Sequence, residues 1–170
     1  MHLMKEKLSF TWINIVFIIL AVVWMGIIFY FSNKTADESN NHSDAVETAI
    51  GKATVDDFNQ KSEEELANFV ERYRVLARKT AHVLEFTLLC MLVFMALPFE
   101  ILMRFRLIGA GVWTVLYAIS DEIHQSFIPG RTGLLSDVLI DIGGTILGVA
   151  AIVILNLVFV KIVKVKEIKQ

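Results

Sequence analysis

Long apolar segments constrain this chain more than any other feature of its sequence. The first covers residues 10–31, reads FTWINIVFIILAVVWMGIIFYF and contains no charged residue. A helix of that length crosses a hydrocarbon core of about 30 Å. The run is too long for the apolar region of a signal peptide, and no small-residue cleavage pattern follows it. We therefore interpret it as a retained membrane helix.

Three further apolar segments lie at about residues 80–103, 105–127 and 134–160. Pro98 ends or kinks the first of these, because proline cannot continue a helix. The next is long enough to span a bilayer only if residues 120–127 continue its helix. The sequence therefore predicts an all-α integral membrane protein, a single domain over residues 1–170 with four transmembrane helices.

Composition narrows the class of function. Hydrophobic residues make up 55% of the chain, which is more than a soluble domain of this size carries. The net charge of −2 gives no electrostatic attraction to nucleic acid, so we expect no nucleic-acid partner. Cys90 is the lone cysteine and cannot form a disulfide within the chain.

The distribution of lysine and arginine predicts the orientation. Basic residues precede the first segment, separate the second from the third and follow the fourth: Lys5, Lys7, Arg104, Arg106, Lys161, Lys164, Lys166 and Lys169. Four spans place all three groups on one side of the membrane. Because basic loops face the cytoplasm, we expect both termini to be cytoplasmic.

Residues 32–79 would then lie on the outer side. Within them, SEEELANFVERYRVLARK opens with Ser62 and Glu65, which have the spacing of a helix capping box. Apolar residues then recur at helical spacing, including Phe69 and Tyr73. This pattern predicts an extracytoplasmic amphipathic helical segment. It either lies on the membrane surface or runs directly into the second span.

Charged residues occur near the outer ends of three spans. At a rise of about 1.5 Å per residue, Glu85 and Asp121 lie about 22 Å from the cytoplasmic ends of their segments, and Asp141 about 30 Å. A charge exposed to lipid at mid-depth costs about 2.5–3.5 kcal/mol. We therefore expect these carboxylates to face one another in a shared polar site open to the outside.

Residue spacing agrees with this depth calculation. The sets that share one helix face are Arg78–His82–Glu85, Asp121–Gln125 and Asp137–Asp141. We expect Arg78, Lys79 and Arg131 to supply counter-charges. Three small residues in the fourth segment are expected to allow close helix contact, namely Gly143, Gly144 and Gly148.

Three motifs in this region resemble those of the VanZ-like membrane family. In order, they read RKTAHVLEF, DEIHQSFIPGR and SDVLIDIGGTILG, and they lie within residues 78–148. Their joint occurrence is far more specific than any one alone. The resemblance implies a small multi-span protein of the bacterial cytoplasmic membrane, associated with resistance to teicoplanin-type glycopeptides. The family usually has asparagine where this chain has Asp141, which adds a potential negative charge.

The resemblance also identifies motif residues by position. They are Arg78, Lys79, His82, Glu85, Phe86, Asp121, Glu122, Gln125, Phe127, Pro129, Arg131, Asp137, Asp141 and Gly144. From these we predict the following ligand-binding residues: Arg78, Lys79, His82, Glu85, Asp121, Glu122, Gln125, Arg131, Asp137 and Asp141.

Two functional hypotheses follow. In the first, the site binds the polar part of a lipid-linked or acylated ligand, such as a lipoglycopeptide or a cell-wall lipid precursor, while the acyl chain stays among membrane lipids. Arg78 and Arg131 would bind a phosphate or carboxylate group of this ligand. In the second, an intramembrane enzyme modifies an envelope lipid or cell-wall precursor. Its catalytic candidates are Glu85 with Asp121 or Glu122 as an acid–base pair, and His82 as an alternative base.

Other interpretations stay open. A metal-dependent enzyme would use Mg²⁺, Mn²⁺ or Ca²⁺, because His82-x-x-Glu85 and Asp121-x-x-His124 place oxygen-rich ligand sets on single helix faces. We assign no cofactor and no metal ligand. The charges would equally serve as an interhelical salt-bridge network. The oligomeric state does not follow from the sequence.

Overall fold

The structure is a computed structural model that describes residues 10–33, 62–129 and 135–168. Four α-helices account for nearly all of these residues: α1 (Trp12–Ser32), α3 (Glu63–Ala96), α4 (Met103–Gln125) and α5 (Leu135–Ile168). No strand occurs in the described ranges. The all-α prediction is therefore confirmed. Most of the predicted outer segment, residues 34–61, lies outside the described residues.

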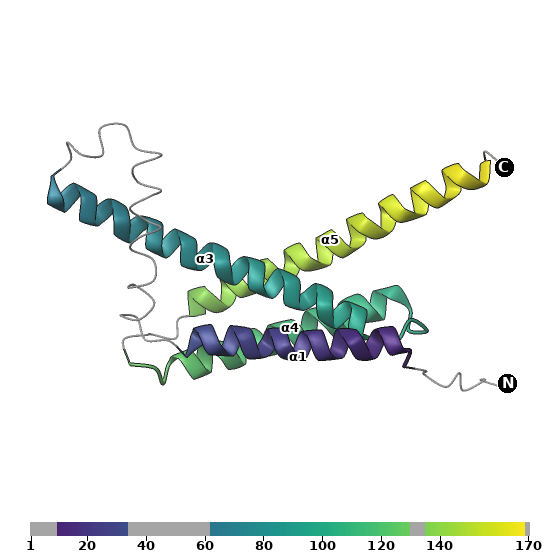
Figure 1. Ribbon diagram of the computed structural model, residues 1–170, viewed down its shortest axis with the longest axis horizontal. Helices are drawn as coiled ribbons and strands as arrows, with labels where there is room; N and C mark the ends of the chain where they lie inside the picture. Colours follow the sequence, from purple (N-terminus) through teal and green to yellow (C-terminus); the bar gives the residue numbers. More distant parts are fainter. Residues whose placement is uncertain (1–9, 34–61, 130–134, 169–170) are drawn as a thin grey trace.

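The helices alternate in direction along one long axis (Figure 1). The start of α1, the α3–α4 connection and the end of α5 lie toward one end of the bundle. The end of α4 and the start of α5 lie toward the other end, where α1 also finishes. α3 contacts all three other helices and crosses α5, so it is the central element.

Local sequence explains where the helices begin. Thr11 caps α1 together with Asn14, whose backbone N–H lies 3.4 Å from the Thr11 hydroxyl oxygen. Ser62 and Glu65 form the predicted capping box at the start of α3, with reciprocal contacts of 3.3 and 3.2 Å. Each cap satisfies backbone N–H groups that have no partner within the first turn of the helix.

The end of α3 is held by a side chain from α1. Asn14 is fully buried, and its Nδ2 donates to the carbonyl oxygens of Met95 and Leu97 at 3.2 and 3.0 Å. Pro98 follows directly, and proline prevents the helix from continuing. The helix ends at Ala96, so the break expected at Pro98 is confirmed and the segment end expected at residue 103 is wrong.

α3 is one continuous helix of 34 residues, about 51 Å long at the usual rise. Of the two alternatives for the amphipathic stretch that begins at Ser62, the structure shows the one in which it runs directly into the second apolar segment. The N-terminal part of α3 projects beyond α1 and α4 (Figure 1). α5 is also longer than predicted, because it continues from the predicted end at residue 160 to Ile168.

Three described helical stretches are long and apolar enough to cross a membrane: Trp12–Ser32, Glu71–Ala96 and Leu135–Lys164. α4 is not among them, because charged residues at its two ends lower its mean hydropathy. The count of four spans therefore stays a prediction. Many large apolar side chains point away from the bundle, for example Ile19, Leu147 and Leu155.

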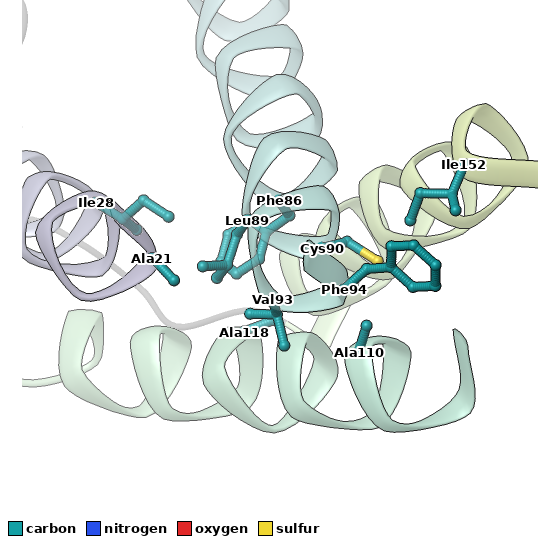
Figure 2. Packing of buried hydrophobic residues seen from close by; sticks show 10 residues of the cluster. All are labelled: Ala21, Ile28, Phe86, Leu89, Cys90, Val93, Phe94, Ala110, Ala118 and Ile152. Carbon is teal, nitrogen blue, oxygen red and sulfur yellow. The ribbon is translucent and has the colours of Figure 1, made fainter. Parts of the chain in front are cut away.

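A small apolar core joins all four helices (Figure 2). Its buried residues are Ala21, Ile28, Phe86, Leu89, Cys90, Val93, Phe94, Ala110, Ala118 and Ile152. Half of them come from α3, and α4 contributes only alanines. Because alanine is small, α4 can lie close against α3, and this contact positions the polar end of α4.

Glycines bring α5 against α3. A Cβ on Gly144 would overlap the carbonyl oxygen of Val83, and one on Gly148 would lie 2.9 Å from the carbonyl oxygen of Thr87. The Thr87 hydroxyl lies 2.9 Å from the carbonyl oxygen of Gly144. The predicted close contact is confirmed for these two glycines. It is wrong for Gly143, which has open space beside its Cα.

Candidate functional site

Polar side chains from all four helices gather toward the end of the bundle where α1 and α4 finish and α5 begins. We call Ser32, His82, Glu85, Asp121, Glu122, Gln125 and Asp141 the polar cluster. Asp141, Asp121, Glu122 and Gln125 are 1%, 3%, 5% and 6% exposed. Helical spacing explains their shared direction, since Asp121 and Gln125 are one turn apart on α4.

The first half of the polar cluster joins α1 to α4. Asp121 Oδ2 accepts hydrogen bonds from the Ser32 hydroxyl and from Gln125 Nε2, both at 2.8 Å. Gln125 Nε2 also lies 3.3 Å from the Ser32 oxygen. These bonds fix the orientation of the Asp121 carboxylate. Its other oxygen, Oδ1, is buried and accepts no hydrogen bond within the described part of the chain.

Ser32 is a site residue that the sequence analysis did not identify. It is 2% exposed and is the last residue of α1. A signal was present, because Ser32 is the first polar residue after the apolar run that ends at Phe31. Its burial depends on how α1 packs against α4, which spacing along one helix does not reveal.

The second half of the polar cluster joins α3 to α5. His82 Nδ1 lies 3.6 Å from Glu85 Oε2 and 3.7 Å from Asp141 Oδ1. Both distances suit an ion pair if His82 is protonated, and both exceed a good hydrogen bond. The contact between Gly144 and Val83 sets the separation, because each residue lies within one turn of a cluster residue on its own helix.

The two halves belong to one site. The Asp141 carboxylate lies within electrostatic range of Glu122, Asp121, Asp137 and Glu85. The predicted convergence of acids from α3, α4 and α5 is therefore observed. Glu122 is buried with its neighbour Asp121, so both consecutive acids of α4 lie inside the bundle.

Aromatic side chains line the apolar side of the polar cluster. The Phe86 ring lies 6.5 Å from the His82 ring and 6.2 Å from the Tyr117 ring. The Tyr117 hydroxyl donates to the carbonyl oxygen of Met25 at 2.7 Å. Trp24 Nε1 donates to the carbonyl oxygen of Glu85 at 3.0 Å. These contacts tie α1 to the helices that carry the acids.

Several predicted site residues lie elsewhere. Arg78 and Lys79 are exposed, and within the described ranges no ion pair joins either to the polar cluster. Asp137 is half-buried at the start of α5. Arg131 lies outside the described residues.

The remaining polar groups near this end have other contacts. His124 is half-buried and stacks on Phe29 with ring centroids 4.5 Å apart. It therefore supports α1 rather than extending a shared set of ligands with Asp121. Across residues 10–33, 62–129 and 135–168, no group of three or more histidine, cysteine, aspartate or glutamate side chains is placed to hold a metal ion.

Comparison with known families agrees with this geometry. A family model described as VanZ/LLP1 matches residues 17–156, well over half of the chain. The chain belongs to the VanZ/LLP1 family. The matched range contains every residue of the polar cluster, from Ser32 to Asp141. The three motifs of the sequence analysis thus pointed to the right family.

No significant match was found among curated proteins or among solved structures. Family membership and the apolar helices together identify a VanZ-like membrane protein.

Proposed function

We propose that this VanZ/LLP1 protein binds the polar part of a lipid-linked or acylated ligand in the outer leaflet of the bacterial cytoplasmic membrane. The ligand is a lipoglycopeptide antibiotic or a lipid-linked cell-wall precursor, and the outcome of binding is resistance to teicoplanin-type glycopeptides. The observation that carries the proposal is the burial of Asp121, Glu122 and Asp141 inside a bundle whose outer surface is apolar.

The cost of burial supports a role in binding. Acidic side chains are rare inside membrane bundles and mark ligand or ion sites, because transfer from water is unfavourable. Exposed apolar residues lie beside the polar cluster on the same helices, for example Leu84 on α3 and Leu139 on α5. An acyl chain would contact these surfaces while its polar end meets the carboxylates.

The arrangement of the helices supports four spans. α4 has 23 residues and is about 35 Å long, which is enough to cross the hydrocarbon core. It runs in the opposite direction to α3 within the bundle (Figure 1). Arg104 and Lys161 lie toward the end at which α1 starts, which the positive-inside rule makes cytoplasmic. The polar cluster then faces outward.

A deletion strain complemented by plasmid tests this function. Wild-type protein should raise the teicoplanin concentration that inhibits growth, and Asp121→Asn should abolish the increase. Glu71→Gln is the matched control, because Glu71 is exposed and pairs only loosely with Arg74 at 3.5 Å. Membrane immunoblots must show equal amounts of all three proteins. Equal protection by Asp121→Asn and wild type would rule out the proposed site.

Photocrosslinking separates ligand capture from indirect protection. A photoreactive acyl glycopeptide and a photoreactive polyprenyl-linked precursor are each added to membranes that contain the protein. Wild-type protein should capture one of them near α3 or α5, and excess unlabelled ligand should compete. Capture of neither probe, with resistance intact, would show that the site does not bind this class of ligand.

One observation favours the enzyme as a second candidate. His82 Nδ1 lies between two carboxylates, at 3.6 and 3.7 Å from Glu85 and Asp141, as an acid–base group often does. Such an enzyme would change the envelope lipid pool, whereas a binding protein would not. Lipid mass spectra of strains with wild type and Glu85→Gln distinguish these outcomes. Identical spectra would exclude the enzyme.

A further inference from the structure

We propose that the polar cluster recognises a protonated amine on its ligand, bound by the carboxylates of Asp141 and Asp121. This inference rests on the proposed function and names the chemical group by which the acylated ligand is held. It replaces the phosphate or carboxylate expected from the sequence with a group of opposite charge.

The charges of the polar cluster favour a cationic ligand. Within the described residues, four carboxylates gather in the polar cluster, and His82 is the side chain placed against them that can carry a positive charge. Asp121 and Asp141 alone contribute two buried acidic side chains. Buried negative charge in a low-dielectric interior favours a cationic ligand and repels an anionic one.

Asp141 and Asp121 also carry buried carboxylate oxygens that accept no hydrogen bond within the described residues. Asp141 is 1% exposed, and neither of its carboxylate oxygens accepts a hydrogen bond within the described residues. His82 at 3.7 Å is too distant to supply one. Asp121 Oδ1 is likewise buried and accepts none there, although Oδ2 accepts two. Buried acceptors of this kind require a donor.

An ammonium group matches this need. It carries three N–H donors and no acceptor. It can therefore donate hydrogen bonds to carboxylate oxygens, and it has no lone pair that would repel theirs. A hard metal ion instead demands six or more oxygens within about 2.6 Å. Within the ranges that the structure describes, no three acidic or histidine side chains are arranged for such coordination.

The positions of the basic residues exclude an anion clamp built from the described part of the chain. Arg78 and Lys79 are exposed, and Arg78 lies one turn before His82 on α3. An anionic group held there would remain in water, outside the polar cluster. The same two residues would instead interact with lipid phosphates at the membrane surface.

Two sources supply an amine on an acyl chain. One is an amino lipid of the membrane, and the other is an acylated glycopeptide with a free amino group. The chemistry at the carboxylates is the same, so the proposal is tested first with the amine alone. The natural source is then distinguished in separate titrations.

Calorimetric titration of the full-length protein in phosphatidylcholine nanodiscs tests the proposal. Phosphatidylcholine has a quaternary ammonium group without N–H donors, so it cannot fill the site in this way. Dodecylamine should bind wild type at least tenfold more tightly than dodecanol, as expected for a charge-assisted hydrogen bond. Asp141→Asn should remove most of that preference, whereas Glu71→Gln should retain it.

Control measurements keep the outcome decisive. Asp141→Asn has nearly the same shape as wild type, and size-exclusion profiles must agree before titration. If this variant does not fold, Asp121→Asn takes its place, because Asp121 Oδ1 is the other unused acceptor. Equal affinity for dodecylamine and dodecanol, or equal dodecylamine affinity in wild type and the folded variant, overturns the proposal.

The two proposals fail in different ways. Capture of an acylated ligand with no preference for amines would overturn this inference and leave the proposed function standing. Nanodiscs doped with phosphatidylethanolamine test the lipid source by competition with dodecylamine. Teicoplanin with its amino group free or acetylated tests the antibiotic source. If neither phosphatidylethanolamine nor teicoplanin with a free amino group competes with dodecylamine, the inference is overturned for natural ligands.

Discussion

Replacing Gly144 with alanine tests the helix contact that sets the geometry of the site. Gly144 packs directly on the backbone of α3, and a new Cβ would overlap the Val83 carbonyl oxygen and lie 3.1 Å from Val83 Cα. Neither contact is with the flexible end of a side chain. α5 would therefore have to move away from α3, which would lengthen the distance between His82 and Asp141.

The magnitude follows from three contributions. Overpacking in a close contact costs about 1–3 kcal/mol. Weakening the 2.9 Å contact between the Thr87 hydroxyl and the Gly144 carbonyl oxygen removes about 0.5–1.5 kcal/mol. The higher helix propensity of alanine offsets about 1 kcal/mol of these two costs. We expect Gly144→Ala to lower the free energy of unfolding by about 2 kcal/mol.

The assay is equilibrium unfolding of the full-length protein in mixed micelles as the fraction of dodecyl sulfate rises. Gly143→Ala is the matched control, because no described atom outside its own stretch of helix lies within 4 Å of a Cβ at Gly143. That variant should gain up to about 1 kcal/mol from helix propensity alone. Equal unfolding midpoints for the two variants would refute the close contact between α3 and α5.

Three further changes test other contacts by the same unfolding assay or by ligand capture. Asn14→Ala should lower stability by about 1–3 kcal/mol, because two buried carbonyl oxygens at the end of α3 lose their donor; no change would refute that cap. Arg106→Lys should cost about 1–2 kcal/mol by breaking the 2.8 Å bond to the Phe94 carbonyl oxygen, while positive charge and topology are kept; unaltered unfolding would argue against this bond. Ser32→Ala should weaken photocrosslinking severalfold with little loss of stability, since it frees the Asp121 carboxylate to rotate; capture at wild-type level would show that its orientation is unimportant.

Structural features that depend on a single helix were predicted correctly from the sequence. The Ser62 capping box, the helix end before Pro98 and the spacing of Asp121 and Gln125 are local properties, and all three appear in the structure. Helix rise measured from charged ends also placed acids of three helices toward the outer ends of their segments. The lengths of apolar runs located the helices in the described ranges to within a few residues, apart from both ends of α3 and the C-terminal extension of α5.

Burial and contacts that depend on how neighbouring helices pack were not predicted correctly from the sequence. Ser32 is buried only because α4 brings Asp121 and Gln125 to it. Arg78 shares a face with His82 yet stays exposed, since no described residue of another helix pairs with it there. Gly143 and Gly144 are adjacent, but only one of them points at α3. Such differences depend on the rotation of each helix in the bundle, which one sequence does not specify.

The central claim is that acids from different helices meet in one buried site, and a double-mutant cycle between His82 and Asp141 tests it most directly. The free energy of unfolding is measured for wild type, His82→Gln, Asp141→Asn and the double variant. Because the two side chains lie 3.7 Å apart in the bundle, we predict a coupling energy of at least about 1 kcal/mol. Effects that add to within about 0.3 kcal/mol would contradict the shared site.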